Sequence, residues 1–394
     1  MTITTRNHTR RMRAAAYGPS QRRRSVIDAE LAVRLDWILL GACAAIAIFG
    51  LLMIYSASRN KVAADPFYYV KRQAFSLAIG IGVVIALLRV DYRKFRDFSL
   101  LAYVITVSAL FFVLTPMGSS VKGHTAWFQL PFNFQLQPSE FAKFGLIVAL
   151  AGYVNEHRGD IDPWRMTVIV GLALVPLGFV QLQPDLGTNM VLMAVVIGLL
   201  AVAGVNGRYL LVLLLLGITG IYAVINLGIL KQYQLDRLNV PALGGTANKK
   251  VGSGYNQDQA LKTAASGGLF GQGYLHGSQT RLGFVPEQQT DFIFTAVGEE
   301  LGFAGAALLL SLFGIVLWRT WRIAQLASDH YGTLVCGGVL AMFTFMIFEN
   351  VGMTLAIMPV AGIPLPFMSY GGSAMLACCA CVGLVANVHA NRFS

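Results

Sequence analysis

Residues 286–318 read PEQQTDFIFTAVGEELGF followed by AGAALLLSLFGIVLW, and this stretch decides the fold. Its second part is an apolar run that, with the residues before it, is long enough to cross a bilayer as a helix. Three carboxylates, Asp291, Glu299 and Glu300, stand at the start of this helix or inside it. An ionised side chain in hydrocarbon is costly unless partners or a water-filled cavity compensate for its lost hydration. The stretch therefore predicts a membrane helix whose first turns face a polar interior.

The composition of the whole chain also indicates a membrane protein. The chain has 394 residues, of which 56% are hydrophobic and only 12% charged, and its mean hydropathy is +0.61. A soluble domain cannot bury so much apolar surface. The net charge of +11 is concentrated in the arginines of residues 1–35 and comes without a nucleic-acid-binding motif. We interpret residues 1–35 as a basic, disordered cytoplasmic tail, and we expect membrane lipids but no nucleic acid as partners.

Apolar runs of about 17–25 residues predict ten membrane-spanning helices. We expect them near residues 36–57, 72–90, 97–116, 139–155, 164–182, 186–205, 208–227, 291–318, 332–356 and 371–389. The predicted fold is thus an all-α polytopic membrane protein, and residues 36–389 form its membrane domain.

The basic residues orient these helices. Most Lys and Arg of the short loops fall on one side, which places both termini in the cytoplasm. One short outer loop departs from this bias, because it carries Arg59, Lys61, Lys71 and Arg72. The bias is statistical, so the predicted topology stands.

Two outer segments are longer than a connection between helices requires. They are residues 118–138 and residues 228–289, and we call the second one the long loop. Loops of such length in compact proteins are usually functional or disordered. Leu, Phe and Tyr in the sequence GGLFGQGYLHG, residues 267–277, favour a structured loop at the membrane surface.

Several polar residues near the outer helix ends have more than one interpretation. Glu140 and Lys143 lie one helical turn apart, so they form either a structural ion pair or part of a site. Asp185 follows a proline between two spans, where it either caps the next helix or contributes to a site.

Asp291 and the two glutamates differ in how easily they are explained. Helix capping could account for Asp291, because Asp favours helix starts. Capping cannot account for Glu299 and Glu300, which lie about 12–14 Å further along the helix. We therefore predict that they line a hydrated cavity that opens outward beneath Asp291.

The sequence gives no support for metal or nucleotide chemistry. The histidines are scattered without an HExxH motif, and no GxxxxGK[ST] loop is present. The five cysteines lie inside apolar runs without metal-ligand spacing. We predict no metal site and interpret the cysteines as small packing residues.

Seven segments together carry a family pattern. They are GLLMIYSAS (50–58), QPSEFAK (137–143), QPDLGT (183–188), YQLDRL (233–238), SGGLFGQG (266–273), FVPEQQTDFIFTAVGEELG (284–302) and GIPLPFMSYGGSAML (362–376). In this order they resemble the SEDS family of bacterial membrane proteins, named for shape, elongation, division and sporulation. The resemblance covers nearly all ten spans. HGSQTRLGFVPEQQTDFIF, residues 276–294, is more similar to the elongation member of the family than to the division member.

The resemblance implies a function and a location. It implies a peptidoglycan glycosyltransferase of the bacterial inner membrane that polymerises lipid II, an undecaprenyl-linked glycan precursor, during cell-wall elongation. It also implies a class B penicillin-binding protein as partner. The acid of the family's T-D-F-I motif, here Asp291, is expected to be catalytic. The expected substrate-binding residues are Trp127, Glu140, Lys143, Asp185, Arg237, Glu287, Ser369 and Tyr370.

The chain departs from the family in one region. Many relatives carry basic residues where this chain has Ala126 and Gln135. If those residues contact pyrophosphate, other cations must do so here, and candidates are Lys122, His124, Arg237, Lys249, Lys250 and Lys262. A divalent cation, Mg²⁺ or Mn²⁺, could also offset the charge of the leaving group.

The predicted mechanism assigns Asp291 the role of general base, which takes the proton of the acceptor hydroxyl as it displaces a lipid diphosphate with inversion. A lipid II flippase or transporter is the rival class, because buried glutamates would fit it equally well. The division-specific member of the same family is the second alternative.

Overall fold

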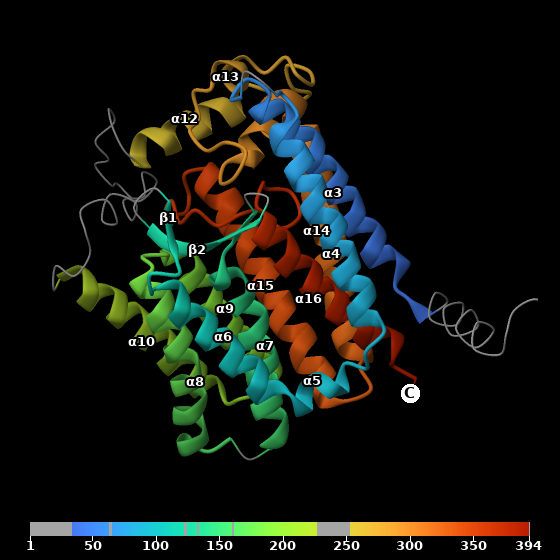
Figure 1. The fold of residues 1–394 in the computed structure, drawn as a ribbon, viewed down its shortest axis with the longest axis vertical. Coiled ribbons are helices and arrows are strands. Elements are labelled where there is room, and N and C mark those ends of the chain that lie inside the picture. Colours follow the sequence, from blue (N-terminus) through green and yellow to red (C-terminus); the bar gives the residue numbers. More distant parts are fainter. Residues whose placement is uncertain are drawn as a thin grey trace, which may run out of the picture.

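The computed structural model describes residues 34–62, 65–121, 124–131, 134–159, 161–226 and 253–393. Figure 1 shows a bundle of long helices with short helices gathered over one end. Residues 1–33, most of the tail, and residues 227–252, which include the first part of the long loop, lie outside the described residues.

Each of the ten predicted spans coincides with a helix. These are α3 (Trp37–Ser58), α4 (Tyr68–Leu88), α6 (Ser99–Val113), α7 (Pro138–Glu156), α8 (Pro163–Leu182), α9 (Leu186–Val202), α10 (Gly207–Asn226), α14 (Ile293–Leu326), α15 (His330–Thr354) and α16 (Gly372–Ala390). In the described ranges, 6 of them are long and apolar enough to cross a membrane: α3, α4, α8, α14, α15 and α16. The prediction of an all-α polytopic membrane protein is confirmed. A short helix, α5 (Arg93–Asp97), links α4 to α6.

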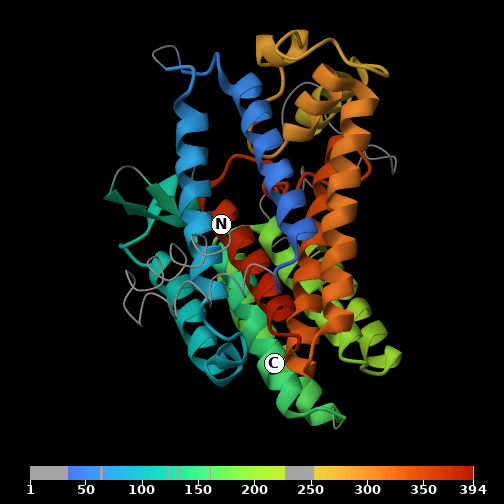
Figure 2. The same ribbon diagram turned by 90° about the vertical axis from the view of Figure 1, so that its right-hand side faces the viewer.

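The helices form an inner and an outer group. The apolar window of α16 is 100% buried inside the protein, whereas that of α4 is only 17% buried. Exposed Ile, Leu and Phe side chains of α4, α6 and α10 therefore face the surroundings, as expected for lipid contact. Figure 2 shows α16 running through the middle of the bundle. All five cysteines are buried and free, in agreement with a packing role.

A small antiparallel sheet, not predicted from the sequence, is built from residues 119–136. Its strands are β1 (Ser119–Val121), β2 (His124–Leu130) and β3 (Phe134–Leu136), in the order β1-β2-β3. Phe128 pairs with Leu136, which brings β2 against the strand that leads into α7. The sheet thus holds β2 beside α7.

The described part of the long loop is folded onto α14. It contains α12 (Ser253–Ala265) and α13 (Ser278–Leu282), seen at the top of Figure 1. Residues 268–273 lie against a break in α14 at Gly302, where φ is 65° and ψ is −162°. Across the break, the N–H groups of Gln272 and Gly273 donate to the carbonyls of Glu299 and Glu300 at 2.9 and 3.0 Å. The N–H of Phe303 donates to the carbonyl of Gly268 at 2.9 Å.

Gly302 cannot be replaced without strain. A Cβ at this position would lie 2.3 Å from the Gly271 nitrogen and 2.7 Å from the Leu269 backbone. Its backbone conformation is also one that only glycine adopts readily. The loop and the helix therefore depend on each other at this point.

A buried ion pair joins three helices at the opposite end of the bundle. Asp36 caps α3 by accepting from the N–H of Leu39 at 3.0 Å, and it also accepts from Arg319 Nε at 2.9 Å. His389 Nε2 of α16 lies 3.8 Å from the same carboxylate. Desolvation raises the pKa of Asp36, but the hydrogen bonds and charges of its partners outweigh this and hold the pKa below its usual value.

Candidate functional site

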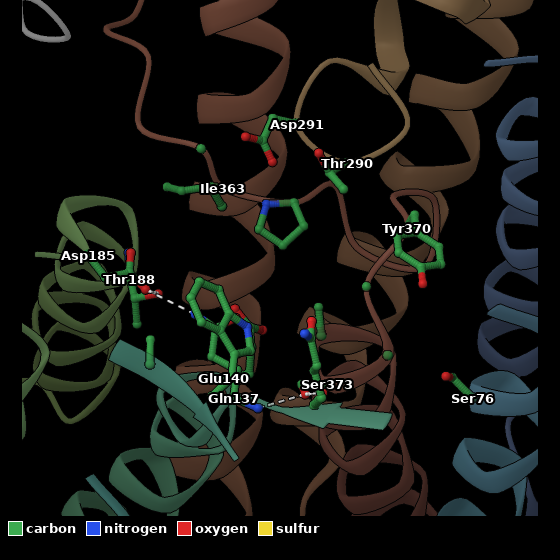
Figure 3. Close-up of a pocket in the computed structure, with 18 of the residues that line it drawn as sticks. Ser76, Gln137, Glu140, Asp185, Thr188, Thr290, Asp291, Ile363, Tyr370 and Ser373 are labelled. Carbon is green, nitrogen blue, oxygen red and sulfur yellow. Dashed lines mark hydrogen bonds between the residues drawn. The ribbon is translucent and has the colours of Figure 1, made fainter. Parts of the chain in front are cut away.

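A cavity of about 880 Å³ lies below the folded loop. Its walls come from the start of α4, the sheet, the first turns of α7 and α9, and the segments 287–291, 361–364 and 370–374. Asp291, Asp185, Glu140 and Tyr370 line the cavity from four different parts of the chain, and Figure 3 shows Asp291 at its top with Asp185 on one side and Tyr370 on the other. Segments far apart in the sequence therefore meet here, as a site requires.

Asp291 is positioned by backbone contacts rather than by helix capping. The helix α14 has Phe292 as its N-cap and begins without a side-chain cap, so capping does not explain Asp291. Asn350 Nδ2 donates to the Asp291 carbonyl at 2.7 Å and to the Ile363 carbonyl at 2.8 Å. This amide ties Asp291 to the 361–364 wall. Gly362, with φ +72°, leaves room there, because a Cβ would come within 3.4 Å of Asp291 Oδ2.

Asp185 fits both interpretations that the sequence left open. It caps α9 by accepting from the Thr188 N–H at 2.9 Å and from Thr188 Oγ1 at 2.7 Å. It also lines the cavity and accepts from Gln137 Nε2 at 3.3 Å. The cap fixes the carboxylate at the cavity wall.

Glu140 and Lys143 likewise form an ion pair inside the site. Lys143 Nζ lies 2.7 Å from Glu140 Oε2, and the two side chains are only 2% and 6% exposed. Both residues line the cavity. Each charge therefore offsets the other in a place with little water.

The other sequence-predicted binding residues divide into three groups. Trp127, Glu287 and Tyr370 line the cavity. Ser369 is not among the lining residues, because its hydroxyl accepts from the Leu365 N–H at 2.9 Å and it is buried. Arg237 lies outside the described residues.

The glutamates of α14 do not line this cavity, so the prediction of a hydrated cavity around them is wrong. Glu299 is fully buried and accepts from the N–H groups of Gln279 and Thr280 at 2.7 and 2.9 Å and from Thr280 Oγ1 at 2.6 Å. Glu300 accepts a hydrogen bond from Ser56 of α3. Their polar surroundings are backbone and hydroxyl groups of the long loop and of α3. The sequence spacing indicated polar partners correctly but could not distinguish them from water.

Several cavity residues escaped the sequence analysis. Gln183 is 1% exposed, lines the cavity, and its Oε1 accepts no hydrogen bond from any described residue. Lys71 and Arg72 of α4 also line the cavity. Their position on the outer side, against the charge bias of the loops, could have indicated that they belong to a site. Lys262, which had been a candidate cation, lies elsewhere and pairs with Asp258 at 2.6 Å. Lys122, Lys249 and Lys250 lie outside the described residues, and the side chain of His124 is not described.

The cavity can accommodate a large, partly charged substrate. Among the described residues, its acids are Glu140, Asp185, Glu287 and Asp291, and its cations are Lys71, Arg72 and Lys143. Within the described ranges, no group of three or more His, Cys, Asp or Glu could hold a metal ion. A carboxylate beside hydrogen-bonding amides and cations suits transfer of a polar group with an anionic leaving group.

Comparison with known proteins identifies the family. The profile described as "Cell cycle protein", which covers FtsW, RodA and SpoVE, matches residues 36–393. The chain belongs to this SEDS family.

Curated SEDS proteins match over most of their length. The chain is 36% identical over 351 residues to Stage V sporulation protein E of Bacillus subtilis, covering 88% of this chain and 93% of that protein. It is 31% identical over 360 residues to peptidoglycan glycosyltransferase MrdB of Escherichia coli K12, covering 91% and 95%. It is 33% identical over 361 residues to a probable peptidoglycan glycosyltransferase FtsW of Trichlorobacter lovleyi, covering 90% and 93%.

Solved SEDS structures share the fold. A chain of a peptidoglycan synthase complex, from a study of how polymerization and crosslinking are coordinated, matches with a TM-score of 0.76 at 30% identity. That match covers 91% of this chain and 99% of the other. The rod shape determining protein RodA of Thermus thermophilus matches with a TM-score of 0.68 at 30% identity, covering 91% and 98%.

Proposed function

We propose that this protein is a peptidoglycan glycosyltransferase that polymerises lipid II during cell-wall elongation. The observation that carries the proposal is the position of Asp291 at the roof of a cavity that also presents hydrogen-bonding amides and cations. The names of the SEDS relatives, two of them glycosyltransferases, support the same reaction.

The proposed reaction needs a base. The C4 hydroxyl of the acceptor's terminal GlcNAc attacks the anomeric carbon of the donor, whose leaving group is undecaprenyl diphosphate. A sugar hydroxyl is a weak nucleophile until its proton is removed as the new bond forms. Asp291 takes that proton, and attack from the side opposite the leaving group inverts the anomeric centre.

The other lining residues position the two sugars. Hydrogen bonds from Gln137 and Thr188 hold the Asp185 carboxylate in place. The remaining lone pairs of its oxygens can accept from sugar hydroxyls. Gln183 Oε1, buried without a hydrogen bond from the described residues, offers another acceptor. Trp127 supplies an aromatic surface, which suits the apolar face of a sugar ring.

The proposal includes a location and a partner. The helices make the chain a multi-pass membrane protein, and we assign it to the bacterial inner membrane with the long loop on the outer side, where glycan is assembled. The similarity to a chain of a peptidoglycan synthase complex supports a class B penicillin-binding protein as partner. An elongation role follows from the resemblance of residues 276–294.

The transporter alternative rested on buried glutamates. In the structure, Glu299 and Glu300 are buried and accept hydrogen bonds from the long loop and from α3. The decisive experiment supplies fluorescent lipid II to the purified protein with and without its penicillin-binding partner. Glycan chains on a gel are expected. Movement of lipid II between leaflets of vesicles without any glycan product would instead support a flippase.

A second experiment tests the cellular role. Expression in cells depleted of their own elongation member should restore the rod shape, and expression in cells depleted of the division member should not restore septation. The opposite pattern would assign the chain to division.

A further inference from the structure

A buried carboxyl group of α15 lies behind the roof of the cavity. Glu349 is fully buried, and neither of its oxygens accepts a hydrogen bond from any residue that the structure describes. Glu299 and Glu300 differ in this respect, because each of them accepts from the long loop or from α3. An acid of this kind inside a membrane protein is a candidate for function.

Glu349 and Asp291 face neighbouring residues of the segment 361–364, which lines the cavity. The Ala361 N–H approaches the Glu349 carboxyl without forming a hydrogen bond of normal geometry. Asp291 Oδ2 lies next to Gly362, where a Cβ would come within 3.4 Å of it. The two acids are thus close enough for the charge of Asp291 to act on Glu349.

The segment between the two acids is held from two sides. Asn350 of α15 donates to the carbonyls of Asp291 and Ile363 at 2.7 and 2.8 Å. On the other side, a Cβ on Gly187 would lie 2.6 Å from the Ala361 carbonyl oxygen, so the start of α9 packs closely against the segment. The segment is therefore fixed between α9 and α15.

Asp291 is the charged group that acts on Glu349. α7, α9, α12 and α14 pack against α15, and the other charged groups at their outer ends have interactions elsewhere. Those groups are the Glu140–Lys143 and Asp258–Lys262 pairs, the α9 cap Asp185, and Glu287, Glu299 and Glu300. α5 and the His389 end of α16 lie at the opposite end of the bundle (Figure 1). In the part of the chain that the structure describes, no cation therefore neutralises Glu349.

A carboxyl group in this position favours its neutral form. Burial without a cation or a hydrogen-bond donor makes the charged form costly. The nearby charge of Asp291 also disfavours a second negative charge. Glu349 therefore keeps its proton at neutral pH, while Asp291 at the cavity roof is available as the base.

We propose that Glu349 is a positioning residue for the reaction, because its neutral acid group keeps a second negative charge away from Asp291 and from the donor's diphosphate. This inference rests on the proposed function and adds to it a residue that lies behind the cavity wall. At alkaline pH the O–H bond of Glu349 breaks and the proton passes to bulk water. The new charge behind the segment 361–364 repels the anionic donor, which then binds more weakly.

The proton on Glu349 can be followed without turnover. Infrared spectra of the full chain in complex with its partner, recorded from neutral to alkaline pH, separate the carbonyl band of a protonated acid from the bands of a carboxylate. The unmodified protein should show an acid band at neutral pH that Glu349→Gln lacks. In Asp291→Asn this band should disappear at a pH lower by about one unit or more, because the Asp291 charge no longer opposes the ionisation.

The effect on the donor is measured as the KM for lipid II over the same pH range. In the unmodified protein KM should rise about 5- to 15-fold as the acid band disappears, the effect of one charge about 10–15 Å away at an effective dielectric constant of about 20. In Glu349→Gln KM should stay level across this range. Glu300→Gln is the matched control, because Glu300 is also buried and its charged neighbours are Glu299 and Arg59 rather than Asp291. Its KM should rise as in the unmodified protein.

The inference would be overturned by the absence of a Glu349-dependent acid band at neutral pH, or by a band that titrates identically with and without the Asp291 charge. An equal rise of KM in Glu349→Gln and in the unmodified protein would also overturn it. If Glu349→Gln does not fold, the Asp291→Asn spectra still decide, because they leave Glu349 in place. A band that responds to Asp291→Asn in a protein that makes no glycan would support the pair of acids and overturn the proposed polymerase instead.

Discussion

Glu299 offers the clearest quantitative test of how the long loop is held. Its carboxylate receives three close hydrogen bonds from the loop, two of them from the backbone of α13. In Glu299→Gln the amide NH₂ must take the place of one carboxylate oxygen. The NH₂ group can take the place of the oxygen that faces Gln279 or of the oxygen that faces Thr280. In either orientation it faces a backbone N–H, and that N–H loses its acceptor.

The expected loss of stability follows from the hydrogen bonds that Glu299→Gln removes. One hydrogen bond to a charged group is lost and one buried N–H remains unsatisfied, which together cost about 2–4 kcal/mol. Thr280 Oγ1 can rotate to accept from the new amide, so the hydroxyl contact survives. The loss falls on the contact between α13 and α14, and residues 277–282 should therefore open locally before the bundle unfolds.

Hydrogen exchange of the detergent-solubilised protein measures this opening, with Glu300→Gln as the matched control. Glu300 accepts from Ser56 of α3, and a Gln there can keep its oxygen toward Ser56 while the hydrogen bonds from α13 to Glu299 stay in place. Amides of residues 277–282 should exchange about 30-fold faster or more in Glu299→Gln, since each 1.4 kcal/mol is tenfold. Equal protection in the two variants would refute the anchoring role of Glu299.

Three further predictions concern stability and the site. Gly302→Ala should destabilise the protein by about 3 kcal/mol or more, because the backbone conformation is strained for alanine and the Cβ would clash with Gly271. Gly314→Ala in the same helix adds a Cβ that meets nothing within 4 Å and should leave the melting temperature unchanged or slightly raised. Equal effects of the two substitutions would contradict the interpretation of the α14 break. Asp36→Asn keeps the α3 cap but removes the ion pair with Arg319, and should cost about 1–3 kcal/mol at neutral pH. The pKa of Asp36 is lowered in the folded protein. The stabilisation is therefore complete above the unfolded pKa of about 3.9 and is lost as the pH falls through the folded pKa. The melting temperatures of the two proteins should converge in acid, and a difference that stays constant with pH would count against the ion pair. Asp185→Ala should destabilise α9 by about 1 kcal/mol while Asp185→Asn should not, and thermal unfolding that fails to separate the two would argue against the capping role.

The helices of this protein could be predicted from sequence because the bilayer imposes a simple rule on apolar runs. All ten spans coincide with helices, and even α7, with Glu140 and Lys143 in its first turns, was found. The sheet of residues 119–136 was not predicted, since its three short strands sit between Gly, Pro and aromatic residues without clear alternation. β2 and β3 also pack against α7 and α16, and no local pattern shows these contacts.

The site was only partly predictable for a related reason. Asp291 stands next to a helix start, so its place above a cavity followed from topology, whereas Asp185 stayed open between a helix cap and a site. Glu299 and Glu300 were assigned to water because the sequence does not show that residues 275–280 return to α14. Arg72 was overlooked because the start of α4 meets the start of α16 only in the fold: Gln73 bonds to Ser369 and Gly371, about three hundred residues away, and such separations cannot be inferred from spacing along one chain.

The measurement that tests the central claim most directly is the initial rate of lipid II polymerisation by Asp291→Asn in complex with the penicillin-binding partner. The variant should fold and bind the partner, because the Asn350 contact is made to the backbone carbonyl of residue 291, which the substitution leaves in place. Removal of a general base should then lower the rate by about 10²- to 10⁴-fold. A rate within a few-fold of the unmodified protein would contradict the assignment of Asp291 as the base.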